Sequence, residues 1–294
     1  MNNKHLLLSG VALLCCISIS PALADEDVDL ELQLLIDTSG SISSQEYDLQ
    51  MRGYSYAFQE SSIQDAILDT SDGSYGSIAV QTVMWSSQGT QQAMTDWTLL
   101  DSASSINSYA DTLYNMSRPF SGATYNAEAL DYGSTLFTDN NFNGTRSVID
   151  MSGDGYGYDY MYSDRWWFNG GDTSIARDNA LLGGIDTING LTITYDYAQV
   201  GDMDLTTWFS NNVIGGTDSF VLQAGDFADF TVALEQKLEA EIEGGYIPTN
   251  AIGPGEVYSA PAPLAGSSLL SLLLLSLYRV VDWTKEKQNR RLYT

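Results

Sequence analysis

The sequence predicts an α/β fold: a doubly wound, mostly parallel sheet flanked by helices, in a single domain followed by a short C-terminal apolar helix. Two observations predict it. Strand-like apolar stretches alternate along the chain with segments of helical periodicity. The first stretch, Val28 to Ile36, begins with alternating leucines and then becomes continuously apolar, which is typical of a strand covered on both faces of a sheet.

A helix is expected directly after this strand. Ser43 to Glu46 has the spacing of a capping box, in which the first and fourth residues satisfy each other's backbone N–H groups. Apolar residues then follow at spacings of four, three and four: Tyr47, Met51, Tyr54 and Phe58. This spacing predicts a helix with one buried face.

The later segments continue the alternation. We expect strands at 78–85, 92–99, 147–151, 191–198 and 219–223, and helices at 104–114, 126–137, 173–185, 205–211 and 227–242. Ser87 to Thr90 predicts a turn between the second and third strands. Residues 139–150 match a calcium-binding EF-hand loop on paper, but 148–150 already belongs to an expected strand, which favours a turn there.

The first 24 residues read as a secretory signal peptide. A basic residue, Lys4, precedes an apolar stretch from Leu6 to Ile19, and Ala22-Leu-Ala24 then precedes an acidic segment. The single histidine and both cysteines lie within it. Cleavage after Ala24 therefore leaves a mature chain without thiol nucleophiles, histidine bases, or zinc sites built on His or Cys. The domain is expected at 25–243.

The other end of the chain has a different character. After a linker at 244–260, residues 261–294 combine a proline motif, an apolar stretch from Leu264 to Tyr278 and a basic tail. This order resembles the C-terminal sorting signals of the PEP-CTERM kind, without their Pro-Glu-Pro triplet. The alternative is a permanent anchor with its positive residues held inside. Either way, we expect an exported protein of the cell envelope or exterior that touches membrane only through this segment.

Charge restricts the partners. The chain has 38 acidic and 12 basic residues, a net charge of −26, and half of the basic residues lie in the two end segments. Nucleic acid and anionic membrane surfaces are poor partners for such a body, whereas divalent cations concentrate near it. The other interpretation is that the charge only keeps the protein soluble. The sequence sets no oligomeric state.

Oxygen-bearing side chains follow the ends of three expected elements. Asp37, Ser39 and Ser41 come directly after the first strand, Thr124 opens a helix after a glycine loop, and Asp154 follows a middle strand. Because ligands collect at the carboxyl ends of the strands in such sheets, these oxygens can converge. An oxygen-only set suits Mg²⁺ or Mn²⁺, with Ca²⁺ as a further possibility. Alternatively, Asp37 only caps the following helix.

Asp-x-Ser-x-Ser, a downstream Thr and an Asp-Gly after the middle strand resemble the metal-ion-dependent adhesion site of a von Willebrand factor type A domain. The resemblance covers roughly residues 28 to 243 and includes "SIARDNALLGGIDTINGLTI" and "NNVIGGTDSFVLQAGDFADFTVALEQKLEAEI", which are similar to secreted bacterial A domains, the domain of unknown function 1194. It implies a von Willebrand A or Rossmann-like fold. It also implies one ligand set: Asp37, Ser39, Ser41, Thr124 and Asp154.

The chemistry of this set favours binding over catalysis. Hydroxyls are neutral ligands, so a bound ion would keep uncompensated positive charge and an exchangeable water, which an Asp or Glu of a protein partner can replace. The sequence therefore predicts a metal-dependent interaction module and no enzyme. Two alternatives are a structural envelope protein and a metal-assisted hydrolase using Asp37 and Asp154. Against the hydrolase, Ser39 stands where phosphoaspartate phosphatases need a second aspartate.

An aromatic insert at 156–168 begins beside Asp154. Tyrosine and tryptophan are enriched in binding hot spots, which makes the insert a candidate partner-binding rim of the metal site. The alternative is a lid whose aromatic rings pack down over neighbouring loops. The rim candidates are Tyr156, Tyr158, Tyr160, Trp166 and Trp167.

Overall fold

The computed structural model describes residues 24–157, 173–193, 199–200, 203–225, 230–244 and 258–259. Within them, one nine-stranded sheet has the order β13-β12-β8-β7-β2-β3-β4, with β5 paired to β3 and β11 to β8. Its strands are β2 (Leu30–Asp37), β3 (Ile78–Trp85), β4 (Gln91–Ala93), β5 (Thr98–Leu100), β7 (Ser147–Gly153), β8 (Thr187–Ile193), β11 (Gly215–Gly216), β12 (Phe220–Ala224) and β13 (Tyr258–Ser259). Two small pairs join β1 (Glu26–Val28) to β6 (Phe142–Gly144) and β9 (Gln199–Val200) to β10 (Met203–Asp204).

The centre of the sheet is parallel and its edges are antiparallel. Strands β12, β8, β7, β2 and β3 run in one direction, whereas β4, β5, β11 and β13 run against their neighbours. In the register, Ile36 of β2 lies opposite Ser152 of β7, and Asp37 lies opposite Trp85 of β3. The ends of three strands therefore meet at one edge of the sheet.

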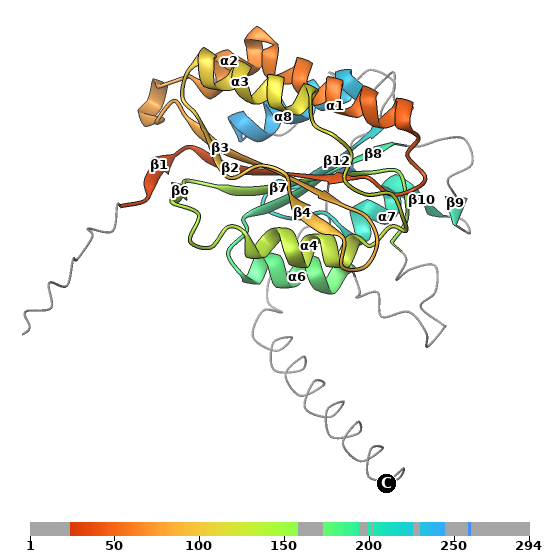
Figure 1. The fold of residues 1–294 in the computed structure, drawn as a ribbon. Helices are drawn as coiled ribbons and strands as arrows, with labels where there is room; N and C mark the ends of the chain where they lie inside the picture. Colours follow the sequence, from red (N-terminus) through yellow and green to blue (C-terminus); the bar gives the residue numbers. More distant parts are fainter. Residues whose placement is uncertain are drawn as a thin grey trace, which may run out of the picture.

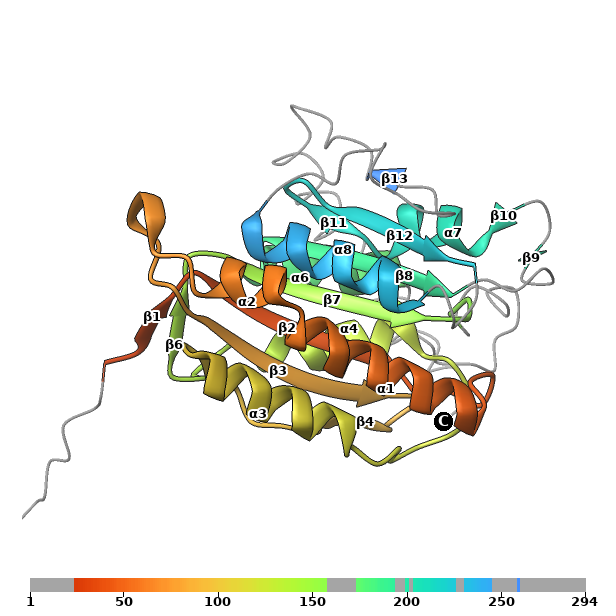
Figure 2. The same cartoon turned by 90° about the horizontal axis from the view of Figure 1, so that it is seen from above.

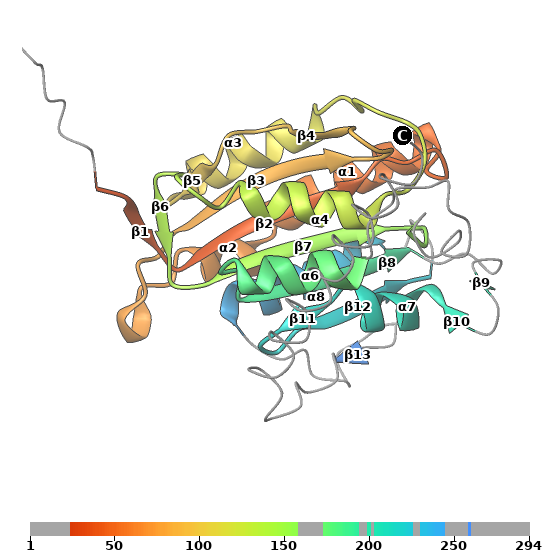
Figure 3. The same ribbon diagram turned by 90° about the horizontal axis from the view of Figure 1, so that it is seen from below.

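Helices cover both faces (Figure 1). One layer contains α1 (Ser44–Gln59), α2 (Ser61–Ile67), α3 (Ala103–Tyr114) and α8 (Phe230–Glu243), seen from outside in Figure 2. The other contains α4 (Asn126–Thr135), α6 (Thr173–Leu182) and α7 (Leu205–Asn212), seen in Figure 3. A hydrophobic core lies on each side of the sheet. Every residue of β2 is buried, which agrees with the continuously apolar stretch from Leu34 to Ile36. The predicted fold class is confirmed.

The first helix begins where its sequence predicts. Ser43 is the N-cap of α1, and Glu46 completes the capping box from the third helical position. The four residues of the apolar stripe, Tyr47 to Phe58, are all buried. This helix follows β2 directly, so its start fixes the loop that carries Ser39 and Ser41.

Two element predictions need correction. The expected strand at 92–99 is two short strands, β4 and β5, because Thr95 interrupts the pairing: its hydroxyl oxygen accepts the backbone N–H of Thr82 at 2.9 Å. The strand expected from 191 begins earlier, at Thr187. Its polar start includes Asn189, which is buried and hydrogen-bonded to Glu241 and to the backbone of Phe220. Residues 148–150 lie in β7, as expected.

A buried ionic cluster connects α8 to the sheet. Lys237, on α8, has a side chain without solvent exposure, and its Nζ lies 2.7 Å from Asp150 Oδ1 on β7. The same ammonium contacts Glu241, one helical turn further along. One positive charge thus serves two carboxylates inside the core.

Nearly all of the predicted signal peptide and of the linker, together with the C-terminal segment, lies outside the described residues, so these assignments stay predictions. Within the part of the chain that the structure describes, no helix has the length and apolar character required to cross a membrane.

Candidate metal centre

The loop after β2 carries the first three predicted ligands at the edge where the strands end. Asp37 is fully buried, and its Oδ1 accepts the backbone N–H of Ser39 at 2.6 Å. The hydroxyl oxygens of Ser39 and Ser41 lie 3.1 Å apart. The tight turn of this loop therefore brings the carboxylate and both hydroxyls to one side of the backbone.

Asp154, after β7, joins this group. The hydroxyl of Ser41 donates to Asp154 Oδ1 at 2.7 Å. The backbone just before Asp154 passes close to Asp37, since a Cβ on Gly153 would lie 3.2 Å from Asp37 Oδ2. Glycine at this position therefore leaves room around that oxygen.

Thr124 reaches the same edge from the glycine loop ahead of α4. A Cβ on Gly155 would lie 3.2 Å from Thr124 Oγ1, which places this hydroxyl against the residue that follows Asp154. The glycine loop is also joined to the first loop, because the Gly40 N–H donates to the Gly122 carbonyl at 2.6 Å. The structure thus gathers the three loops that carry the predicted ligand set.

The two carboxylates of this group lie in a buried environment, close enough to influence each other. Burial, followed by the nearby charge of Asp154, raises the pKa of Asp37 to about 8. Burial also raises the pKa of Asp154 above its ordinary value, although the Ser41 hydrogen bond opposes the change. Asp37 Oδ2 is buried and has no hydrogen-bond partner. An acceptor left open near a second carboxylate and the two serine hydroxyls fits a hard divalent cation.

The donor set is short of carboxylates. Among the residues that the structure describes, no group of three or more His, Cys, Asp or Glu side chains is arranged to hold a metal ion. An ion at this edge would therefore depend on Ser39, Ser41 and Thr124, whose hydroxyls carry no charge.

Arg118 holds the first loop in place, and sequence reasoning missed it. Its guanidinium donates to the carbonyl oxygens of Thr38 and Ile42 at 2.8 Å each, and also to those of Ser39 and Phe120. It lies over the Tyr47 ring, 5.9 Å from its centroid. The guanidinium presents five N–H donors in a rigid planar fork, which can reach carbonyls in both loops, whereas a lysine has three donors on one nitrogen. The only signal in the sequence was a basic residue in an acidic body.

We expect Arg118→Met to weaken Mn²⁺ binding by roughly 10- to 100-fold, the range for groups that orient metal ligands. Arg118→Lys should fall between Met and wild type, because it keeps the charge but loses the fork. Isothermal titration calorimetry with Mn²⁺ measures this. Arg52→Met is the matched control: Arg52 lies on α1 over Tyr114 and loses the same charge. If Arg118→Met binds Mn²⁺ with the affinity of the wild type, Arg118 does not position the metal ligands.

The aromatic insert is described only at its start. Tyr156 is 8% exposed, and its ring packs edge-on against Trp208 of α7 at 5.9 Å. Tyr156 therefore offers little surface to a partner. The other four rim candidates, Tyr158, Tyr160, Trp166 and Trp167, lie outside the described residues and stay predictions.

Several solved structures are similar to this chain. The pilus adhesin SpaC from Lactobacillus rhamnosus GG superposes with a TM-score of 0.51 at 15% identity, over 75% of this chain and 32% of its own. A von Willebrand factor type A protein from Catenulispora acidiphila gives a TM-score of 0.45 at 12% identity, over 74% and 43%. The PilB minor pilin from Streptococcus sanguinis gives 0.45 at 13%, over 80% and 65%. This chain spans 32% of the length of the pilus adhesin and 48% of that of proximal thread matrix protein 1 from the mussel byssus, another solved structure that it matches.

No curated protein matches the sequence. A family model does match: the family described as "Protein of unknown function (DUF1194)" covers residues 27–246, which is most of the chain and includes every predicted metal ligand. The chain therefore belongs to this family.

Proposed function

We propose that the protein is an exported interaction module that binds a carboxylate of a protein partner through one divalent ion, Mg²⁺ or Mn²⁺. The ligands in this proposal are Asp37, Ser39, Ser41, Thr124 and Asp154. The observation that carries it is the buried Asp37 Oδ2, which has no hydrogen-bond partner and lies in a group with Asp154 and the serine hydroxyls.

The proposed ligands are of two kinds, charged and neutral. Asp37 and Asp154 supply negative charge, whereas the three hydroxyls supply neutral oxygens, and Arg118 fixes the loop that carries Ser39 and Ser41. When bound, the ion would supply a Lewis-acidic point with room for one further carboxylate oxygen. On a chain with a net charge of −26, such a point would select a partner that presents Asp or Glu there.

The fold is compatible with an adhesive role. A pilus adhesin has a similar fold over 32% of its length. Export to the cell envelope, with the C-terminal segment as sorting signal or anchor, belongs to the same proposal.

Affinity capture from envelope extracts tests the proposal. The full chain is immobilised in Mg²⁺, in chelator, and as the Asp37→Asn variant in Mg²⁺. We expect the same partner, identified by mass spectrometry, to be retained only by the wild type in Mg²⁺, and to lose binding when one of its surface Asp or Glu residues is replaced by alanine. A partner retained equally in chelator would show that the interaction does not need the ion.

A further inference from the structure

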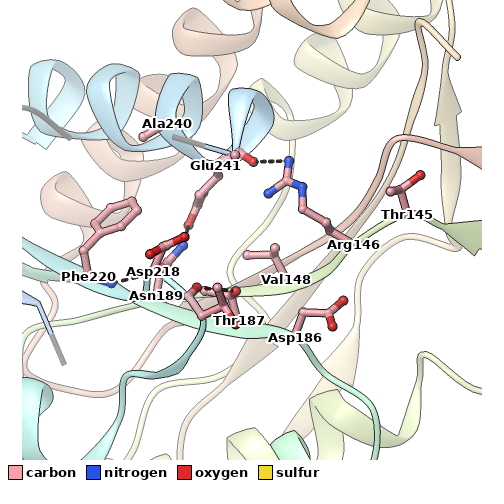
Figure 4. A pocket seen from close by; sticks show the side chains of 12 residues that line it. Thr145, Arg146, Val148, Asp186, Thr187, Asn189, Asp218, Phe220, Ala240 and Glu241 are labelled. Carbon is pink, nitrogen blue, oxygen red and sulfur yellow. Dashed lines mark hydrogen bonds between the residues drawn. The ribbon is translucent and has the colours of Figure 1, made fainter. Parts of the chain in front are cut away.

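A pocket of about 240 Å³ lies at the opposite end of the sheet from the candidate metal centre. It is formed between the last turn of α8 and the first residues of β7, β8 and β12 (Figure 4). Its lining includes Val148, Phe220, Glu241, Asp186 and Asp218. The volume far exceeds the roughly 10–15 Å³ that one water molecule needs.

Glu241 provides a buried acceptor in this pocket. The residue is 2% exposed. Its Oε1 accepts from Asn189 Nδ2 at 2.9 Å and also contacts Lys237. Asn189 cannot turn its amide around without loss, because its Oδ1 accepts the Phe220 N–H at 3.0 Å. The other oxygen, Glu241 Oε2, is buried without a hydrogen-bond partner. A buried acceptor of this kind calls for a donor.

The charges around the pocket favour a cation as that donor. Lys237 neutralises only one of two buried carboxylates, since Asp150 lies 2.7 Å from its Nζ. Asp186 and Asp218 are exposed at the rim. Arg146 directs Nη2 to the carbonyl oxygens of Glu241 and Ile242 at 2.8 Å each, so it caps the end of α8. Burial, which outweighs the opposing charge of Lys237, raises the pKa of Glu241 to about 7.

An organic cation fits better than a metal ion. Among the residues that the structure describes, no three acidic side chains are arranged to hold one metal. A primary ammonium group has three N–H donors, of which one can bond to Glu241 Oε2 and the others to water in the pocket. Val148 and Phe220 line the pocket and supply apolar walls for its carbon chain.

We propose that this pocket binds a small primary ammonium ligand, whose N–H donates to Glu241 Oε2 while its alkyl part lies against Val148 and Phe220. Asp186 and Asp218 attract it at the rim. The site is independent of the candidate metal centre, so either proposal can fail alone.

The probe is n-butylammonium chloride, added to the ¹⁵N-labelled full chain at constant ionic strength. Binding in the millimolar range or tighter is expected, with shifts of the backbone amide signals of Phe220, Thr217 and Gly244. Sodium butyrate and 1-butanol have the same carbon chain without the positive charge, and neither should shift these signals. No shift with n-butylammonium, or equal shifts with 1-butanol, would overturn the proposal.

Glu241→Gln is the decisive variant. Glutamine keeps the shape of the side chain and one oxygen that can accept from Asn189 and Lys237. It removes the negative charge and puts an NH₂ donor in place of Oε2, so the affinity for n-butylammonium should fall at least tenfold. Asp218→Asn should cost about threefold, and asparagine tolerates the positive φ of 53° at this position. Asp111→Asn, on the exposed face of α3, removes the same charge far from the pocket and should change nothing. Equal affinity in Glu241→Gln and wild type would contradict the assignment.

Discussion

Replacing Asp37 by asparagine is expected to abolish binding of Mg²⁺ and Mn²⁺ while the domain stays folded. The variant keeps an oxygen that can accept the Ser39 N–H, so the loop geometry survives. It removes one of the only two carboxylates in the ligand set, and the loss should exceed the roughly 10- to 100-fold that removal of a merely supporting group costs. Asp37→Ala should give the same loss of metal binding, with the Ser39 hydrogen bond lost as well.

Calorimetry and thermal unfolding check this result together. The melting temperature of the wild type should rise with added Mn²⁺, because a ligand that binds only the folded state stabilises it. The melting temperature of Asp37→Asn should not respond. Asp65→Asn, an exposed position on α2, is the control for a lost negative charge and should behave as the wild type. Equal Mn²⁺ affinity in Asp37→Asn and wild type would refute the ligand assignment.

Replacing Lys237 by methionine is expected to give the largest loss of stability. The change leaves Asp150 and Glu241 buried without their shared cation, and removing one partner of a buried ion pair costs about 3–5 kcal/mol. Methionine has a similar length and no charge, so the loss reports the electrostatics and not a cavity. Urea unfolding followed by tryptophan fluorescence measures the free energy of unfolding.

The loss in Lys237→Met should grow with pH. Burial raises the pKa values of Asp150 and Glu241 in the folded state even with the lysine present. A carboxylic acid whose pKa is raised in the folded state keeps its proton to a higher pH there than in the unfolded state. The free energy of unfolding therefore falls as the pH rises from about 4 through the folded pKa. The difference in free energy of unfolding between wild type and Lys237→Met should therefore be larger at pH 8.5 than at pH 5.5.

A rescue variant separates charge from packing. Lys237→Met combined with Asp150→Asn and Glu241→Gln removes all three charges and should recover most of the lost free energy, because neutral amides cost less to bury than ionised carboxylates. A loss below about 1 kcal/mol in the single variant, or no recovery in the triple variant, would contradict this view of the cluster.

Local signals predicted much of the fold. The buried strand β2 and the capping box of α1 are each set by a few neighbouring residues, and the structure has both. The loop between them carries Asp37, Ser39 and Ser41, so its place at the edge of the sheet followed from the same signals. Their grouping with Thr124 and Asp154 came from the order of strands and from the family resemblance.

The features that the sequence did not predict depend on distant partners. The carbonyl groups bound by Arg118 belong largely to residues 76 to 80 positions earlier in the chain. The polar start of β8 is buried because Asn189 meets Glu241, 52 residues later. Lys237 and Glu241, four residues apart, have the spacing of an exposed helical ion pair, yet both are buried. Neither propensity nor periodicity within one segment contains this information.

The most direct test of the central claim is a crystal structure of the protein grown with Mn²⁺, with anomalous diffraction measured near the manganese absorption edge. We expect one strong anomalous peak at the edge where β2 and β7 end, bounded by oxygens of Asp37, Ser39, Ser41, Thr124 and Asp154. A map without a peak there, or with manganese bound only elsewhere on the acidic surface, would contradict the proposed ligand set.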